Sequence, residues 1–187
     1  MTLADGRLHP TERHLLDELG DLDPAASQFD ALEAWENLVH VSGELIRGRP
    51  SPDEWSALEV LAHLTAVELT NGLRYRAMLV EDSPVLTDYE VADWAPLLRR
   101  ADIDVGSLLA LFRALRLANL DFWEHLDATG RGRIGIHPEC GPESIELRFR
   151  MLAGHDRMHL AQARRALQAV WGGATGRLQR DVEPPVR

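Results

Sequence analysis

The stretch SIELRFRMLAGHDRMHLAQARRALQAV, residues 144–170, decides the fold of this chain. Its apolar side chains recur at helical spacing, which predicts one long amphipathic helix. Pro142 and Ser144 open this segment, and Gly172 and Gly173 are expected to end it. The apolar stripe consists of Ile145, Phe149, Leu152, Ala163, Ala166 and Val170. Such a stripe needs partner helices that cover it.

Two histidines interrupt this stripe. His155 and His159 are four residues apart, so their side chains leave the same helix face and can converge on one ion. Burying two imidazoles in an apolar seam costs on the order of a few kcal/mol unless their nitrogens find partners. A shared metal would satisfy them, and so would hydrogen bonds to neighbouring hydroxyls or carbonyls. With 8 histidines in the chain, the spacing alone leaves both readings open.

Three further helical segments precede this one. They are expected at about 27–46, 55–80 and 105–126, and breakers such as Gly48, Pro50 and Pro52 separate them. Ser51 or Asp53 can cap the second segment, and Asp104 can cap the third. The stripe of the third segment is expected to contain Leu108, Leu111, Phe112, Leu115, Ala118 and Phe122. No pattern indicates paired strands, so the predicted class is all-α.

The connections predict a four-helix bundle with up-down-down-up order. A short Pro-rich link joins the first two helices, which should make them antiparallel neighbours. Residues 81–104 form a crossover long enough to let the second and third helices run parallel, and it is expected to pack as a lid with a short helix. We therefore expect an N-terminal extension at 1–24 with a short helical stretch around 11–19, the bundle at 25–172, and a flexible tail at 173–187.

Composition excludes several classes of protein. The net charge is −10 and no stretch gathers arginines into a basic face, which argues against nucleic-acid binding. No apolar run is long enough for a membrane span, and the start of the chain lacks the pattern of a signal peptide, so a cytoplasmic protein is expected. The single cysteine, Cys140, excludes an internal disulfide and a multi-cysteine zinc site. It is expected to be inert, and any metal site must use histidine and carboxylate.

A third ligand could come from the second helix. His63 has Val60, Ala66 and Val67 within one turn and Glu68 five residues further on. Taken alone, a histidine in such a place is ordinarily structural. The remaining histidines are interpreted as surface or capping residues: His9, His14, His40, His125 and His137.

Three sequence motifs together resemble a known family. WSALEVLAHLTAVE (55–68) resembles the second-helix signature of the DinB/YfiT-like superfamily, and HPECGPESIELRFRMLAGHDRMHLAQ (137–162) resembles its fourth-helix signature. Between them, DYEVADWAPLLRRADID (88–104) and the following ALFRALR (110–116) are similar to the crossover and third helix of that family. The similarity covers about residues 25 to 170, in the correct order.

The resemblance implies an up-down-down-up bundle, commonly a homodimer, with zinc or nickel bound by one histidine of helix two and two of helix four. Those positions are His63, His155 and His159 here. Characterised enzymes of the family are mainly thiol transferases that use mycothiol, bacillithiol or glutathione, with isomerases among them. The expected substrate is therefore a small molecule.

Three neutral imidazoles leave a coordination position open, which is typical of a catalytic site. That position can bind water, or it can hold a low-molecular-weight thiol as its thiolate for attack on an electrophile under the crossover. The thiol is the favoured hypothesis, and the alternatives are a metal-dependent hydrolase and a non-catalytic metal-binding stress protein.

Other polar residues near the predicted ligands have no assigned catalytic role. Glu68 or Asp156 could orient a ligand histidine, although Asp156 lies one position off the stripe and is expected to face solvent. Arg74 and Arg157 could meet an anionic substrate, but arginines on helices are usually surface charges, and they are interpreted as such here.

Overall fold

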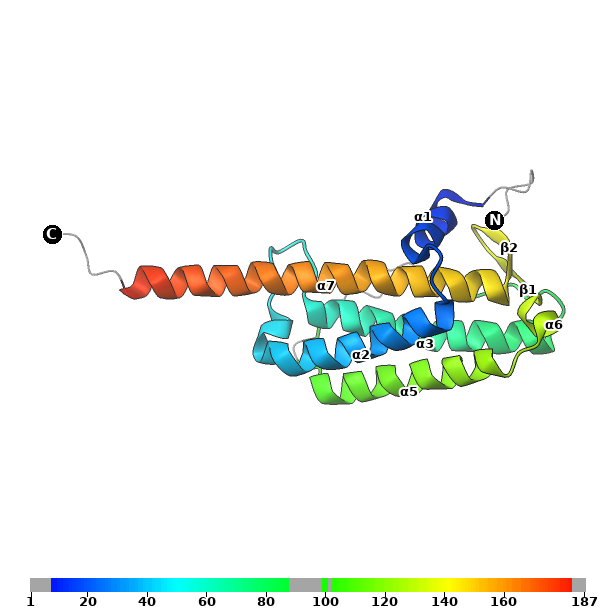
Figure 1. The fold of residues 1–187 in the computed structure, drawn as a ribbon, viewed down its shortest axis with the longest axis horizontal. Coiled ribbons are helices and arrows are strands. Elements are labelled where there is room, and N and C mark those ends of the chain that lie inside the picture. Colours follow the sequence, from blue (N-terminus) through cyan, green and yellow to red (C-terminus); the bar gives the residue numbers. More distant parts are fainter. Residues whose placement is uncertain (1–7, 88–98, 101, 183–187) are drawn as a thin grey trace.

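The described residues form an all-α four-helix bundle (Figure 1). The computed structural model describes residues 8–87, 99–100 and 102–182, with residues 173–182 described by backbone alone. The long helices are α2 (Pro24–Ser42), α3 (Ala57–Val80), α5 (Val105–Glu124) and α7 (Ile145–Val182). Helices α2 and α7 run in one direction and α3 and α5 in the other, so the predicted up-down-down-up order is confirmed.

Capping side chains set where the helices begin. The Asp23 carboxylate accepts from the backbone N–H of Ala26, and the Asp104 carboxylate accepts from that of Ser107, each at 2.8 Å. Helix α3 begins with a capping box in which Ser56 and Glu59 satisfy each other's backbone N–H groups. The cap of this helix is therefore Ser56, and the prediction of Ser51 or Asp53 was wrong by one turn.

The four helices pack as a ring in the order α2, α7, α3, α5. Helices α2 and α3 are antiparallel, but they lie diagonally across the core, so the prediction that they are direct neighbours was wrong. The 3-10 helix η1 (Gly43–Arg47) follows α2 at once and packs against both α3 and α7, which carries the chain across the end of the bundle. Most of the expected lid falls on 88–98, outside the described residues.

Two apolar clusters fill the bundle. One lies around Trp35, Leu61 and Phe112, and the other lies around Tyr75, Trp123 and Phe149. In the second cluster the Trp123 and Phe149 rings stack with their centroids 4.1 Å apart. Each large side chain removed from water stabilises the fold by about 1.5–3 kcal/mol, so the bundle has an apolar core of its own at both ends.

The N-terminal region contributes a helix to the fold. Helix α1 (Pro10–Leu19) packs against α7, and its capping box pairs His9 with Glu12. The close approach takes place at Gly154, where an added Cβ would overlap the Leu15 carbonyl oxygen of α1. The short helical stretch expected here is thus present, and it is docked on the bundle.

The segment before α7 differs from the sequence prediction. It contains a short helix α6 (Ala128–Arg131) and an antiparallel hairpin of β1 (Ile134–His137) and β2 (Gly141–Ser144), although no strands were expected. The hairpin closes through Gly141, which has a φ of 80° that glycine adopts without steric cost.

Helix α7 also continues past the expected stop at Gly172 and Gly173 to Val182, and its last part projects beyond the other helices (Figure 1). Two glycines lower helix propensity by only about 1 kcal/mol each, which does not end a helix that nothing forces to turn. No helix in the described part of the chain combines the length and apolar character that crossing a membrane requires.

Candidate metal centre

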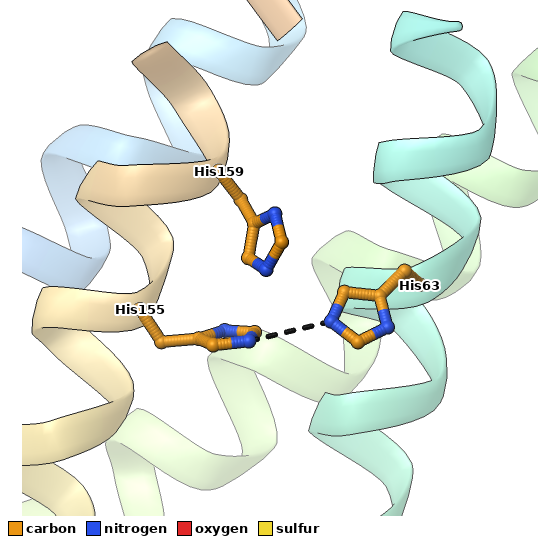
Figure 2. A group of neighbouring side chains, drawn as sticks. All are labelled: His63, His155 and His159. Atoms are coloured by element: carbon orange, nitrogen blue, oxygen red, sulfur yellow. Dashed lines mark hydrogen bonds between the residues drawn. The ribbon is translucent and has the colours of Figure 1, made fainter. Parts of the chain in front are cut away.

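Helices α3 and α7 pack together and bring three histidine rings close to one another (Figure 2). His63 comes from α3, and His155 and His159 come from successive turns of α7. The Nε2 atoms of His63 and His155 are 3.3 Å apart, and one nitrogen from each of the three rings lies within 4.8 Å of the others. The structure therefore brings together all three residues that the sequence analysis assigned to a metal.

Neighbouring side chains hold these rings in place. The His159 Nδ1–H donates to the Gln162 side-chain oxygen at 2.8 Å, which leaves the lone pair of that ring on Nε2. The Trp55 ring stacks on His159 with 6.4 Å between centroids and lies 5.3 Å from the His63 ring. Gln162 and Trp55 thus fix the orientation of the part of the centre nearest to solvent.

Burial keeps the three rings neutral. It lowers the pKa of His63 to about 3, with a smaller contribution from repulsion by His159. Burial also lowers the pKa of His155, where His159, His63 and Arg116 add repulsion. The pKa of His159 is lowered by burial as well, although its hydrogen bond with Gln162 acts in the opposite direction. At neutral pH all three therefore offer lone pairs, as metal ligation requires.

The donor set fits a divalent transition metal. Three neutral imidazole nitrogens that face one another are the ligands that zinc and nickel accept, and no acidic side chain needs to join them. The His155 Nδ1 atom is buried and has no hydrogen-bond partner among the described residues. Its Nε2 atom instead faces His63 Nε2 at 3.3 Å, so Nε2 is the atom at which this ring would bind a metal.

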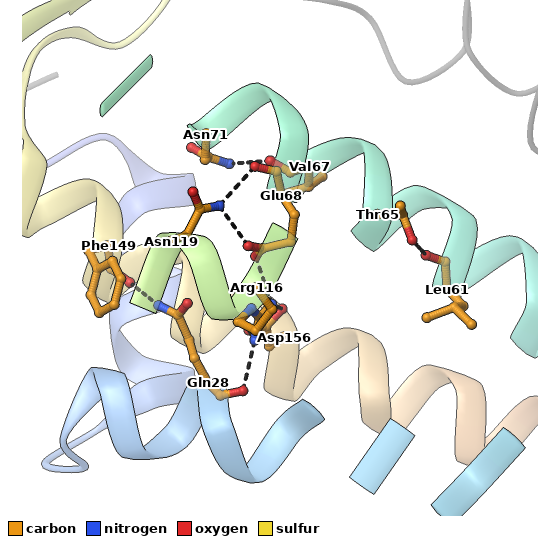
Figure 3. Close-up of polar contacts among 10 residues, drawn as sticks. All are labelled: Gln28, Leu61, Thr65, Val67, Glu68, Asn71, Arg116, Asn119, Phe149 and Asp156. Carbon is orange, nitrogen blue, oxygen red and sulfur yellow. Dashed lines mark hydrogen bonds and ion pairs between the residues drawn. The ribbon is translucent and has the colours of Figure 1, made fainter. Parts of the chain in front are cut away.

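A buried ion cluster joins α3, α5 and α7, and its Asp156 directly follows His155 in the chain (Figure 3). Arg116 of α5 binds Glu68 at 2.8 Å and Asp156 at 2.7 Å, and all three side chains are at most 1% exposed. Asn119 donates to Glu68 at 2.8 Å. The expectation that Asp156 faces solvent was wrong, because the carboxylate points inward to Arg116. Both carboxylates bind this arginine, and the alternative hypothesis that one of them orients a ligand ring has no contact to support it in the described part of the chain.

The cluster carries a net charge of −1 when both carboxylates are ionised. Burial raises the pKa of Asp156 to about 6, because it outweighs the attraction of Arg116, and the Glu68 charge adds to the increase. Burial alone would lower the pKa of Arg116, but the two carboxylates outweigh it and raise that pKa. Arg116 itself therefore stays charged.

Sequence reasoning missed Arg116. Helical spacing could have predicted its burial, because Arg116 lies four residues from both Phe112 and Leu120 and therefore on the same helix face. All three residues are buried. The predicted stripe of this helix instead included Leu111, which is 51% exposed. The buried face of α5 is thus rotated from the predicted one, and it carries Arg116 and Asn119 into the core.

The three histidines line two separate pockets. One, of about 310 Å³, extends from His63 and His155 toward the β hairpin and is bordered by α1. The other, of about 660 Å³, is lined by Trp55, His159 and Gln162 among others. Different members of the histidine group therefore border different pockets.

A second group of possible ligands lies in the hairpin. His137, Cys140 and Glu143 place one ligand atom each within 4.8 Å of the others. However, His137 Nδ1 accepts from the backbone N–H groups of Glu139 and Cys140 at 3.3 and 3.2 Å, which places the ring proton on Nε2. Glu143 forms an ion pair with Arg148, and burial raises the pKa of the Cys140 thiol. The three histidines are therefore the stronger candidate for a metal centre among the described residues.

The two arginines interpreted as surface charges differ in the structure. Arg157 is exposed and donates to the Glu18 carbonyl at 2.8 Å, as a surface residue does. Arg74 is buried, at 7% exposure, and its Nε donates to the Thr87 carbonyl at 2.8 Å. The surface interpretation of Arg74 was wrong, because the chain after α3 folds back over it.

Comparisons with known proteins identify related sequences and a related fold. The family model of the DinB superfamily matches residues 25–163. A Halalkalibacterium halodurans protein named as a candidate metal-dependent hydrolase is 27% identical over 115 residues, which cover 62% of this chain and 67% of that protein. An Oceanobacillus iheyensis protein with the same kind of name is 28% identical over 107 residues, 57% of this chain and 62% of its own length.

A solved structure shares the fold. YfiT from Bacillus subtilis, described as a candidate metal-dependent hydrolase with an unusual four-helix bundle topology, superposes with a TM-score of 0.63. The match covers 86% of this chain and 87% of that one at 19% sequence identity. At that identity the likeness concerns the fold.

Proposed function

This chain belongs to the DinB superfamily, and from that premise we propose that it is a metal-dependent enzyme that transfers a low-molecular-weight thiol to an electrophile. The observation that carries the proposal is the convergence of His63, His155 and His159 as neutral imidazoles. These residues would hold zinc or nickel. A divalent metal on three imidazoles keeps a position open and lowers the pKa of the thiol or water that binds there.

The remaining residues of the site prepare the ligands. Gln162 fixes the tautomer of His159 by accepting its Nδ1–H, and Trp55 limits water on the solvent side. Glu68 and Asp156, the acidic residues that follow the ligand histidines in the sequence, both bind Arg116. The ligands offered to a metal are therefore the three imidazoles.

The two pockets favour a reaction between two molecules. Hydrolysis needs one substrate and water, whereas thiol transfer needs room for a thiol and an electrophile. Two pockets offer that room: one of about 310 Å³ lined by His63 and His155, and one of about 660 Å³ lined by His159. The homodimer and the cytoplasmic location remain predictions from the sequence.

A metal-dependent hydrolase is the second candidate. It is favoured by the names of the relatives from Halalkalibacterium halodurans and Oceanobacillus iheyensis. The same three imidazoles would serve it, because an open position can lower the pKa of water as well as that of a thiol.

Metal content tests the centre directly. Elemental analysis of the purified protein should find about one zinc or nickel per chain, and His155→Ala should lose most of it, because the loss of one ligand of three weakens binding strongly. His40→Ala is the matched control, since His40 is an exposed helix residue. Full metal content in His155→Ala would remove that residue from the site.

An activity panel separates the three functions. Thiol transfer predicts turnover of electrophiles only when mycothiol, bacillithiol or glutathione is added. Cleavage of esters or amides without thiol would support the hydrolase instead. Tight metal binding with no turnover of either kind would support a non-catalytic metal-binding protein, and it would contradict the proposal.

A further inference from the structure

The pocket between the metal centre and the β hairpin has two chemically different ends. His63 of α3 and His155 of α7 form one end. Arg74, Arg148 and His137 line the other end, on α3, α7 and β1 respectively. From the helical rise, Arg148 lies about 10 Å along α7 from His155, and Arg74 lies about 16 Å along α3 from His63.

The middle of this pocket is mainly apolar. Val67, Met151 and Leu152 lie between the two ends on α3 and α7, and Leu15 of α1 lines the pocket from outside the bundle. A ligand that spans the pocket must therefore have an apolar central part, because a polar group placed there would lose its contacts with water.

The far end is built to hold cationic side chains in fixed positions. Arg148 donates to Asn71 at 2.8 Å, which links α7 to α3, and it also forms an ion pair with Glu143. Arg74 donates to the Thr87 carbonyl. His137 accepts backbone N–H groups at Nδ1, so its Nε2 carries a proton. None of the described residues that line this pocket is acidic.

We propose that this pocket selects elongated substrates that carry a carboxylate or phosphate at one end, bound by Arg148, and a reactive group at the other end, placed at the three histidines. The inference rests on the proposed function, because it takes the metal centre as the reactive end. Arg148 is a specificity-determining residue in this scheme, since Asn71 and Glu143 bind its Nε and Nη1 and hold the guanidinium in place, while Nη2 can donate to an oxyanion.

Binding of hydroxamates tests the inference without an activity assay. The probes are octanohydroxamic acid and its analogues with a terminal carboxylate or a terminal phosphonate, titrated calorimetrically into protein with and without added zinc. The hydroxamate group binds the metal, so the probes differ only at the far end. We expect the terminal anion to increase affinity about tenfold, the usual value of one hydrogen bond to a charged group. Comparison of the two anions distinguishes carboxylate from phosphate recognition.

The variants locate this preference. Arg148→Met should reduce the preference for the anionic probe to about twofold or less while the affinity for octanohydroxamic acid is retained. Because Arg148→Met leaves Glu143 buried without its partner, the double variant Arg148→Met, Glu143→Gln provides the same test in a balanced background. Arg113→Met is the matched control, since Arg113 is an exposed residue of α5. Equal binding of all probes to the native protein, or an unchanged preference in both variants, would overturn the inference.

A metal-free comparison separates this inference from the proposed function. If added zinc does not increase the affinity for any hydroxamate, the proposed metal centre is refuted. The anionic end is then tested separately, by comparing the affinities of octanoate and octanol for the metal-free protein. Octanoate binding that requires Arg148 supports the anionic end, and equal binding of octanoate and octanol refutes it.

Discussion

Arg116 lies between Glu68 and Asp156 in the core, and it joins three of the four long helices through these contacts. It also donates to the Gln28 backbone carbonyl at 2.9 Å, which adds the fourth helix. A buried ion pair adds little net stability over an apolar packing, but the removal of one partner leaves a charge buried without compensation. Arg116 is therefore the residue at which a single change affects the whole core.

The substitution Arg116→Met should lower the free energy of unfolding by about 3–5 kcal/mol, because two carboxylates would stay buried without a cation. Urea unfolding followed by circular dichroism measures this. The control Arg113→Met should cost less than about 1 kcal/mol, since its ion pair with Glu36 is exposed. Similar losses in the two variants would show that the buried cluster has no special role.

Glu59, which is not one of the metal-centre residues, should make the free energy of unfolding depend on pH. Burial would raise its pKa, but hydrogen bonds from Arg49 and Ser56 outweigh it and hold the pKa below the usual 4.5. The stabilisation by ionised Glu59 is therefore complete above about pH 4.5 and is lost as the pH falls through the lower pKa of the folded state. Glu59→Gln should lower the free energy of unfolding by about 1.5 kcal/mol at pH 7.

Urea titrations at a series of pH values measure this effect. The difference in the free energy of unfolding between Glu59→Gln and the native protein should shrink toward zero as the pH is lowered from 5 to 3. Glu36→Gln serves as control, because the Glu36 pair with Arg113 is exposed and should give little difference at any pH. A difference for Glu59 that grows on acidification would contradict the assigned direction.

At the level of elements, α1 depends on one glycine of α7. The Leu15 carbonyl of α1 occupies the position that a Cβ at Gly154 would take. Thr11 and Leu15 of the same helix line the pocket beside the histidines, so the docking of α1 determines how closed this pocket is.

Gly154→Ala should displace α1 and leave the four-helix bundle intact. We expect a loss of about 1–3 kcal/mol, the usual cost of overpacking, and faster amide hydrogen exchange in Pro10–Leu19 than in the bundle helices. Gly172→Ala is the matched control in the same helix, because an added Cβ there meets nothing within 4 Å. Unchanged exchange of α1 in Gly154→Ala would mean that the two helices can separate slightly without undocking.

At the scale of the whole molecule, the bundle should fold without its metal. The apolar clusters around Trp35 and around Tyr75 contain no metal ligand, so both persist when the ion is removed. A metal that binds the folded state adds about 2.7 kcal/mol at a free concentration of 100 times its Kd.

Chelation should therefore lower the melting temperature by about 5–11 °C without abolishing the cooperative transition, given the usual 2–4 °C per kcal/mol for a chain of this size. Differential scanning calorimetry at several zinc concentrations measures the shift. His155→Ala should show the same melting temperature at every concentration. A chelated protein with no transition at all would mean that the metal is required for folding.

The helical class, the approximate position of each helix and the common direction of His155 and His159 were predictable from the amino-acid sequence. These features follow from local periodicity, because four residues complete about one turn of any α-helix. The length of residues 81–104 also sufficed for the up-down-down-up order. His63 was identified by the resemblance to a family, since nothing local distinguishes it from a structural histidine.

Which helix faces pack against each other depends on the folded arrangement of the helices. This arrangement rotated the buried face of α5, turned Asp156 and Glu68 to Arg116, placed α2 diagonally to α3 and docked α1 at Gly154. Each of these depends on contacts between residues far apart in the chain. A charged side chain beside an apolar stripe can either face solvent or be buried against a partner. It is buried when a neighbouring helix supplies a side chain of opposite charge.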